Sequence, residues 1–449
     1  MNEVKKVAFC SLGCKVNQYE TNAMAQKFIE HGYEVVEFDE YADVYIVNTC
    51  TVTNVADRKS RQMLRRAKEI NKDATLVACG CYAQVAKDEL KKIPEIDLII
   101  GNNEKNDIIQ IVENHIAQKG AEDLVSNVMY KLDYVELGTT TYTEKTRAVI
   151  KVQDGCDRFC SYCLIPYARG HIRSRKIENV IEEIKKVVEE GINEVVITGI
   201  HIASYGRDFK GENIGLIDLL EEINKIQGLH RIRLGSIEPT FIRVEFVVSL
   251  SKFVKICDHF HLSLQSGCTE TLKRMNRKYT AEETEKATER IRKFFPNAAL
   301  TADIIVGFPG ETDKEFNKTY ELLKRIKLYK IHVFKYSPRK GTKAAVMENQ
   351  VNGNVKEERS NKLLELSDKY EEEFNNASIG KTLSVLFEEK CGEYVKGHTT
   401  IYRVVKVKIK EKIEQDSKKE LKIEKQLENE IRNVKIMQSD GLELIGEIV

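Results

Sequence analysis

Three cysteines stand close together in the segment GCDRFCSYC, with the spacing Cys156-x-x-x-Cys160-x-x-Cys163. Three thiolates in one tight loop can bind three irons of a [4Fe–4S] cube, and the fourth iron then has no local cysteine ligand. That iron would offer an open coordination site. The alternative is a structural zinc site of the Cys₃His type, with His171 as the fourth ligand. Zinc motifs usually come as paired knuckles, so the single triplet favours an iron–sulfur cluster.

A second set of cysteines follows three strand-like segments of the N-terminal region. Cys14 lies in the loop after the first segment, Cys50 ends VYIVNTC, and Cys81 follows ATLVACG. Loops at the carboxyl ends of parallel strands converge on one crevice, so these three thiols can meet. Cys10 and Cys79 fall inside strands, where a buried thiol behaves as a small hydrophobic side chain. The spacing alone leaves open that all of these cysteines are structural.

The composition of the chain is that of a globular protein without a membrane span. Of its 449 residues, 42% are hydrophobic and 31% are charged. No apolar run reaches the ~18 residues that a span needs, so we expect a cytoplasmic protein with no membrane partner. Thiols stay reduced in that compartment, and the eleven cysteines therefore need a function other than disulfides. Cys257, Cys268 and Cys391 show no ligand spacing.

Residues 1–140 alternate strand and helix patterns. Continuous apolar strands in such an alternation predict a parallel sheet that is covered on both faces. The expected strands are 5–10, 44–50, 74–80 and 96–102, and the clearest helices are 17–31 and 54–72. Residues 121–145 are polar and Thr-rich, and most of them are expected to form a connection.

Residues 145–375 repeat the alternation and predict a partial (β/α)6 barrel, because right-handed crossovers add each strand beside the last. The fold class is therefore α/β. The six expected strands are 147–155, 194–202, 231–239, 260–267, 300–310 and 330–338, with helices such as 177–190, 281–294 and 313–328 between them.

Residues 376–449 change to short alternating strands, which predict a small all-β barrel. The expected strands are 381–389, 400–409 and 434–449. The Lys/Glu-rich stretch 410–431 interrupts them and is expected to be a solvated insertion.

Polar and glycine residues gather where barrel strands two to five end. The carboxyl ends of the strands form the mouth of the barrel, where a charged cofactor needs hydrogen bonds and close backbone approach. Each residue taken singly fits ordinary loop chemistry equally well, but four strand ends together favour cofactor binding. The candidates are Gly199, His201, Ser236, Glu238, Gln265 and Ser266.

Arginines supply candidate RNA contacts, although the formal net charge of +1 gives no general argument for a nucleic-acid partner. Arg58, Arg61 and Arg65 recur at helical spacing on one face, which suits a phosphate backbone. The alternative is a solvated helix face. Just beyond the cysteine loop lie Arg169, Arg173 and Arg175, which could meet the substrate or a cofactor carboxylate.

Over essentially its whole length the chain resembles the radical S-adenosylmethionine methylthiotransferases. The matching segments include SLGCKVNQYET, DVYIVNTCTVTNVADRKSRQ, ACGCYAQ, CDRFCSYCLIPYARGHIRSR, HLSLQSGCTETLKRMNRKYT and DIIVGFPGET. Within the family, GCKVNQYET and IPYARGHIRSR are most similar to enzymes that modify N6-threonylcarbamoyladenosine in tRNA. The C-terminal β region resembles the RNA-binding TRAM module, although its insertion at 410–431 is longer than that resemblance leads us to expect.

The resemblance implies two [4Fe–4S] clusters and S-adenosylmethionine as radical source and methyl donor. One cluster would lie on Cys156, Cys160 and Cys163, with Tyr162 against the adenine of the cofactor. The radical formed there would remove hydrogen from C2 of the target adenine. The other cluster, on the second cysteine set named above, would present a sulfur for methylation. Hydrogen abstraction requires no general acid–base pair, and no catalytic side chain is singled out.

The implied partners are the anticodon stem-loop of tRNA with its base at position 37, a sulfur donor, and a one-electron reductant such as a flavodoxin or ferredoxin. Rival substrates in the same family are isopentenyl-adenosine in tRNA and an aspartate of a ribosomal protein. A hypothesis from another class is a non-enzymatic iron–sulfur protein that binds RNA and senses oxidation.

Overall fold

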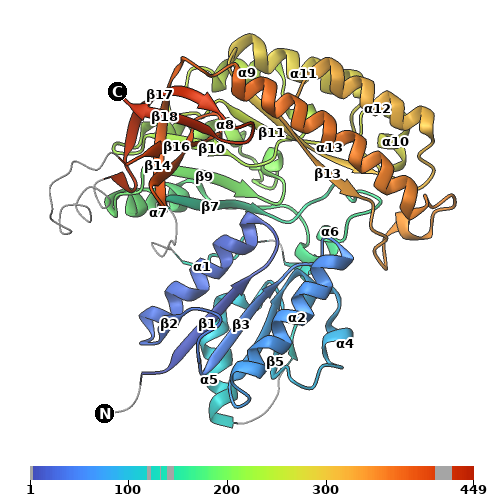
Figure 1. The fold of residues 1–449 in the computed structure, drawn as a ribbon. Coiled ribbons are helices and arrows are strands. Elements are labelled where there is room, and N and C mark those ends of the chain that lie inside the picture. Colours follow the sequence, from blue (N-terminus) through green and yellow to red (C-terminus); the bar gives the residue numbers. More distant parts are fainter. Residues whose placement is uncertain (1–3, 119–122, 132, 139–145, 410–426) are drawn as a thin grey trace.

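The N-terminal region forms a six-stranded parallel sheet in the order β2-β1-β3-β4-β5-β6 (Figure 1). The computed structural model describes residues 4–118, 123–131, 133–138, 146–409 and 427–449. The strands of this sheet are β1 (Lys6–Ser11), β2 (Glu34–Val36), β3 (Val44–Thr49), β4 (Thr75–Gly80), β5 (Leu98–Ile100) and β6 (Asp123–Leu124).

Helices cover both faces of this sheet, as its apolar strands require. Phe28 of α1 and Val112 of α5 belong to the core on one face, and Leu64 of α2 and Leu90 of α4 to the core on the other. The helix α2 begins at a side-chain cap, where the amide of Ala56 donates to Thr53 Oγ1 at 3.1 Å. The helices are α1 (Lys15–Glu30), α2 (Asn54–Ile70), α3 (Cys81–Val85), α4 (Lys87–Leu90) and α5 (Ile108–Gln118).

The central region is a partial barrel made of two sheets, β10-β9-β7-β8 and β11-β12-β13. Isolated bridges join the sheets, Ile232 to Ile256 and Ile237 to Leu262, and one continuous hydrophobic core fills the region. The strands are β7 (Arg147–Asp154), β8 (Arg173–Ser174), β9 (Glu194–Gly199), β10 (Arg231–Leu234), β11 (His259–Gln265), β12 (Ala299–Val306) and β13 (Lys330–Lys335).

Helices surround the outside of the partial barrel (Figure 1). The last of them, α13 (Gly353–Asn376), packs along β13, where the amide of Ile331 donates to Ser367 Oγ at 2.9 Å, and so shields the final strand. The others are α7 (Ile177–Glu189), α8 (Leu216–Lys225), α9 (Val244–Leu250), α10 (Thr269–Arg274), α11 (Ala281–Phe294) and α12 (Asp313–Ile326). The short helix α6 (Ile165–Arg169) instead contacts α3 of the N-terminal region.

The C-terminal region is a closed barrel in the order β14-β15-β16-β18-β17. Its apolar interior includes Phe387, Val405 and Ile436. The strands are β14 (Thr382–Cys391), β15 (Tyr394–Thr399), β16 (Val404–Lys408), β17 (Ile431–Ser439) and β18 (Leu444–Ile448).

The predicted fold class is confirmed: a parallel α/β sheet, a partial barrel and a small β-barrel. The expected connection 121–145 contains the short strand β6 and a 3-10 turn at Val128–Tyr130, while residues 121–122, 132 and 139–145 lie outside the described residues. Residues 410–426 of the expected insertion also lie outside them. Within the described ranges, each helix is either too short or too polar to cross a membrane.

Candidate functional site

The barrel cysteines lie in a loop between β7 and α6 that backbone hydrogen bonds hold tightly. Gly155 has a φ of +69°, and a Cβ there would lie 1.8 Å from the carbonyl oxygen of His171. The amide of Cys156 donates to the Gly170 carbonyl at 3.0 Å, and the amide of Cys163 donates to the Cys160 carbonyl at 3.0 Å. Glycine at position 155 therefore permits the close approach of the start of the loop to the backbone at Gly170 and His171.

The three barrel thiols are free and interact electrostatically with one another. Burial raises the pKa of Cys156 to about 11 and that of Cys163 to about 12, and the charge of Cys160 adds to both shifts. Thiols in this state bind metal only as thiolates, so bound metal ions must supply the positive charge that keeps them deprotonated. The guanidinium of Arg277 adds a further positive charge, because its Nη1 donates to Cys160 Sγ at 3.3 Å.

The contact of His171 does not separate zinc from iron, because its Nδ1 lies 2.6 Å from Asp157 Oδ1 and a zinc-bound histidine makes the same kind of contact through its second ring nitrogen. Among the residues that the structure describes, no three Cys, His, Asp or Glu side chains are grouped so as to hold a single metal ion. A cube places each thiolate on a different iron, so its ligands stand farther apart than the ligands of one zinc ion. Three thiols that interact within one loop fit the ligand set of an iron–sulfur cube.

A buried carboxylate, Glu238, contacts an arginine and a histidine at the mouth of the barrel. Arg158 Nη2 lies 2.7 Å from its Oε1, and His201 Nε2 lies 3.3 Å from its Oε2. Burial alone would raise the pKa of Glu238, but the hydrogen bond with His201 and the charge of Arg277 outweigh burial and lower it to about 2. Because Arg277 also contacts Cys160, an ionised carboxylate and a cluster thiol share one guanidinium.

The other predicted cofactor residues are placed less uniformly. Ser236 is exposed, and Gln265 ends β11 with a φ of +64°, a strained conformation of the kind often found at functional sites. The ring of Tyr162 packs edge-on against Phe308 at a centroid distance of 6.2 Å. Cofactor contacts by these residues stay a prediction.

Gly199 and Ser266 have contacts within the barrel that account for them. A Cβ at Gly199 would lie 2.9 Å from the carbonyl oxygen of Gln153 on the neighbouring strand. The buried hydroxyl of Ser266 lies 3.2 Å from Thr319 Oγ1 and accepts from the amide of Cys268 at 3.2 Å. Their predicted role in cofactor binding therefore has no separate support in the geometry.

Cys14, Cys50 and Cys81 meet at the carboxyl ends of β1, β3 and β4. A Cβ on Gly13 would lie 2.6 Å from Cys50 Sγ, and Cys50 is influenced by the charges of both Cys81 and Cys14. Burial raises the pKa of Cys50 to about 12; the residue Cys14 is exposed, yet desolvation around its thiol also raises its pKa. These three thiols thus share one crevice and fit the same all-thiolate cluster chemistry.

The remaining cysteines were not predicted to be ligands, and of these Cys79 lies near enough to Cys81 to interact with it electrostatically. Cys79 is fully buried in the core of the sheet, and Cys10 packs partly buried against the core of the opposite face. Cys257 and Cys268 are buried, and Cys391 is exposed.

Arg169, which ends α6, connects the two cysteine sets. Its Nε donates to Cys81 Sγ at 3.3 Å, although Arg169 follows Cys163 by only six positions. Its Nη2 donates to Asn17 Oδ1 at 2.6 Å and to Glu20 Oε2 at 3.0 Å. The barrel loop and the N-terminal crevice therefore face the same space between the two regions (Figure 1).

Several of these contacts involve residues that no sequence pattern marks. Arg277 and Glu20 lie inside the quoted segments HLSLQSGCTETLKRMNRKYT and SLGCKVNQYET but have no spacing that marks them. Lys151 is different, because a lysine within the apolar strand 147–155 signals a buried ion pair. Its Nζ lies 2.8 Å from Glu20 Oε1 and 2.7 Å from Asp154 Oδ2.

The predicted RNA-binding arginines divide by exposure. Arg58 and Arg65 are exposed on α2, whereas Arg61 is half-buried and donates to the Tyr82 hydroxyl at 2.6 Å. The prediction that Arg173 and Arg175 contact RNA is wrong, because these side chains are only 1% and 2% exposed. Their guanidinium groups contact carboxylates of the protein and are not available to a phosphate backbone.

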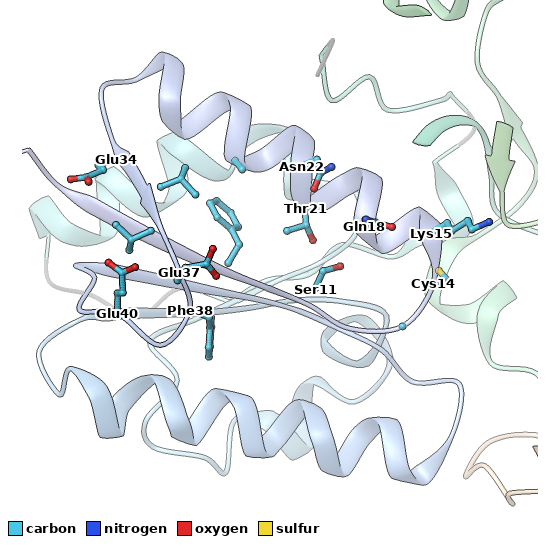
Figure 2. Close-up of a pocket in the computed structure, with 15 residues that line it drawn as sticks. Ser11, Cys14, Lys15, Gln18, Thr21, Asn22, Glu34, Glu37, Phe38 and Glu40 are labelled. Atoms are coloured by element: carbon cyan, nitrogen blue, oxygen red, sulfur yellow. The ribbon is translucent and has the colours of Figure 1, made fainter. Parts of the chain in front are cut away.

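A pocket of about 630 Å³ opens beside Cys14, between α1 and the edge formed by β1 and β2. Figure 2 shows Cys14 and Lys15 at one end of this pocket and Glu34 and Glu40 at the other. The acidic end thus lies away from the thiols, and the pocket adds only an approach to Cys14 from solvent.

Comparison with known proteins agrees with this geometry. Residues 150–323 match the family model described as the radical SAM superfamily, which places the barrel in that class of enzyme and implies a [4Fe–4S] cluster and S-adenosylmethionine. Residues 6–101 match the model described as uncharacterized protein family UPF0004.

Curated relatives match the chain over most of its length. Threonylcarbamoyladenosine tRNA methylthiotransferase MtaB of Bacillus subtilis is 44% identical over 86% of each chain. The protein of the same name from Aquifex aeolicus is 42% identical over 86% of this chain and 93% of its own. tRNA-2-methylthio-N(6)-dimethylallyladenosine synthase of Caldicellulosiruptor saccharolyticus is 33% identical over 97% of this chain and 91% of its own. The chain therefore belongs to the radical S-adenosylmethionine methylthiotransferase family.

Among solved structures, the radical S-adenosylmethionine methyltransferase TsrM from Kitasatospora setae has a similar fold. The TM-score is 0.58 at 15% sequence identity, and the match covers 77% of both chains. At this identity the likeness concerns the fold alone.

Proposed function

We propose that this enzyme converts N6-threonylcarbamoyladenosine at position 37 of tRNA to its 2-methylthio derivative. The observation that carries the choice of substrate is the ranking of the relatives. Those named for threonylcarbamoyladenosine from Bacillus subtilis, Aquifex aeolicus and Thermotoga maritima are 44%, 42% and 37% identical. The dimethylallyladenosine synthases of Caldicellulosiruptor saccharolyticus, Moorella thermoacetica and Desulforamulus reducens are 33%, 34% and 35% identical.

Both cysteine sets would hold [4Fe–4S] clusters. When bound, the barrel cluster with S-adenosylmethionine would supply a 5′-deoxyadenosyl radical for C2 of the adenine, and the second cluster would present a sulfur for methylation. The protein contributes thiolate ligands, Cys156, Cys160 and Cys163 for the barrel cluster and Cys14, Cys50 and Cys81 for the other. Charged groups around Glu238, with His201 and Arg158, would orient the polar groups of S-adenosylmethionine at the barrel mouth.

Recognition of the tRNA would rest on exposed basic groups and on a single-stranded target base. An anticodon loop leaves its bases unstacked, so they enter a pocket at little energetic cost. Arg58 and Arg65 of α2 are the exposed candidates for phosphate contacts, and the C-terminal β-barrel is a candidate second contact. We further propose a cytoplasmic location, a separate sulfur donor, and a flavodoxin or ferredoxin as the one-electron reductant.

Nucleoside mass spectrometry of tRNA from a deletion strain tests the substrate. We expect the 2-methylthio derivative of threonylcarbamoyladenosine to disappear and its precursor to accumulate, while the 2-methylthio derivative of isopentenyl-adenosine is unchanged. The wild-type gene and a Cys257→Ala variant should restore the product, because Cys257 is buried away from both cysteine sets. A Cys81→Ala variant should not restore it. Loss of the isopentenyl product instead would reassign the substrate.

Iron analysis tests the cofactors independently of the substrate. After anaerobic reconstitution, two cubes require about eight irons and eight sulfides per chain. About four irons in the wild-type chain, with the same content in a Cys50→Ala variant, would contradict the second cluster. Incubation with dithionite and S-adenosylmethionine should release 5′-deoxyadenosine, and its absence from a fully loaded sample would favour a non-enzymatic sensor.

A further inference from the structure

Arg169 lies at the centre of a buried charged network between the N-terminal sheet and the barrel. The side chain is fully buried, and its Nη1 lies 3.3 Å from Asp154 Oδ2 in addition to its bonds to Glu20 and Asn17. Only its Nε points away from these partners, and this group donates to Cys81 Sγ. The network therefore fixes the guanidinium in one orientation with one donor directed at a candidate cluster ligand.

The described network holds more positive than negative charge. Glu20 and Asp154 are its two carboxylates. Its four cations are Lys105, Lys151, Arg169 and Arg173. The network thus has two more cationic than anionic side chains, and Arg169 is the member that contacts Cys81. Buried charge without a counter-charge is strongly unfavourable. A cube held by three thiolates is a net anion, and reduction adds one more negative charge.

We propose that Arg169 is a positioning residue for the N-terminal cluster, which it reaches from the barrel through Cys81 Sγ. The inference rests on the proposed second cluster. Hydrogen bonds and positive charge at a cluster sulfur stabilise the reduced state, so Arg169 raises the reduction potential of this cluster. Because Arg169 ends the helix that follows Cys163, it also fixes the N-terminal cluster relative to the barrel loop.

Arg277 provides an internal comparison at the other site. Its Nη1 donates to Cys160 Sγ at the same distance, 3.3 Å, while its Nη2 lies 3.5 Å from Glu238 Oε2. Each cysteine set therefore receives one guanidinium donor that a buried carboxylate holds in place. Substitution of Arg277 should change the potential of the barrel cluster and leave that of the N-terminal cluster unchanged.

The test is a redox titration of the N-terminal cluster in the full-length chain. A parent with Cys156→Ala, Cys160→Ala and Cys163→Ala leaves one cluster, whose reduced fraction is followed by electron paramagnetic resonance at fixed potentials. Adding Arg169→Gln should lower the ratio of reduced to oxidised cluster about tenfold, which equals ~59 mV for a one-electron couple. Arg169→Lys, which keeps the charge without the planar donor, should recover part of that ratio.

Lys105→Gln is the matched control, because it removes a buried cation of the same network that bonds Glu20 and Asn48 but no cysteine. Its effect should be clearly smaller. An unchanged ratio in Arg169→Gln, or an equal change in Lys105→Gln, would overturn the proposal. If Arg169→Gln does not retain its iron, Arg169→Lys becomes the test. A ratio of reduced to oxidised cluster in Arg169→Lys equal to that of the parent would contradict the role of the contact between Arg169 and Cys81. A parent without iron would contradict the second cluster itself, which is a failure of the proposed function.

Discussion

At the scale of single residues, each cysteine set contains thiols whose protein surroundings oppose ionisation. Burial raises the pKa of Cys50 and Cys163 to about 12 in each case. Thiolate ligation at neutral pH therefore depends on cations that the site receives, from bound iron and from the guanidinium groups of Arg169 and Arg277. Assembly of each cluster should release protons, because Cys50 and Cys163 are neutral thiols at neutral pH until metal binds.

Gly155 gives a prediction about the barrel loop. In Gly155→Ala, the new methyl group meets the His171 carbonyl and the backbone keeps a φ of +69°, so the loop must shift. We expect the barrel cluster to be lost and iron to fall from about eight to about four per chain after reconstitution. Gly32→Ala is the control, since Gly32 has a φ of +83° with nothing within 4 Å of a Cβ. Full iron content in Gly155→Ala would contradict this role.

Glu238 gives a prediction about pH. The lowering of its pKa from 4.5 to about 2 corresponds to about 3 kcal/mol of stability. A lowered carboxyl pKa stabilises the fold above pH 4.5, and the contribution is lost as the pH falls from there toward 2. In urea unfolding of the metal-free chain, Glu238→Gln should therefore be less stable than wild type at pH 7, and the difference should narrow at pH 3.5. The exposed Glu245→Gln should show neither effect, and a constant difference for Glu238→Gln would refute the ion pairing.

At the scale of elements, the sequence predicted those parts of the fold that local patterns encode. Continuous apolar strands followed by amphipathic helices led to the sheet and the partial barrel. Alternation predicted three C-terminal strands, but the barrel has five. Turns at Gly392 and Gly441, which have φ values of +61° and +95°, separate β14 from β15 and β17 from β18. The strand β2 is only three residues long and partly exposed, so its pattern was too short to detect.

The candidate site divides in the same way. The cysteine positions follow from motifs and from strand ends, whereas the contact of Arg169 with Glu20 joins residues 149 positions apart. Such a contact depends on how two regions pack, which no local pattern encodes. For the same reason Arg173 and Arg175, adjacent to a cysteine loop, were expected to meet a ligand and are instead buried.

The helix α2 gives a prediction about tRNA binding. Arg58 and Arg65 are exposed, so replacing both with Gln should weaken binding and reduce the slope of log K against log salt by about 0.7–0.9 for each lost phosphate contact. Filter binding at several salt concentrations measures this. Arg66→Gln is the control on the same helix, because Arg66 Nη2 is paired with Asp39 Oδ1 at 2.8 Å. An equal loss of tRNA affinity in the double variant and in Arg66→Gln would mean that α2 does not contact the tRNA through the face that carries Arg58 and Arg65.

At the scale of the whole molecule, the barrel holds the N-terminal sheet at more than one point. Arg169 reaches the crevice from α6, and Arg339, just after β13, reaches the start of α2. The Nη2 of Arg339 donates to Thr51 Oγ1 and Asp57 Oδ2 at 2.6 Å each. Because Thr51 follows Cys50 directly, this contact fixes a second cysteine loop against the barrel. Both regions must therefore be docked for the two cysteine sets to face each other.

Arg339→Met should loosen this docking while leaving each core intact. The substitution leaves Asp57, which is only 8% exposed, without the guanidinium of Arg339. Removing one partner of a buried ion pair typically lowers the free energy of unfolding by about 3–5 kcal/mol. Hydrogen exchange of peptides from residues 49–60 should accelerate, whereas exchange in β9 and β10 should not change. Arg325→Met is the matched control, because its exposed pair with Glu285 is worth at most about 1 kcal/mol. If exchange at 49–60 is unchanged in Arg339→Met, the Cys50 loop is held by the N-terminal sheet alone, and the barrel does not set its position.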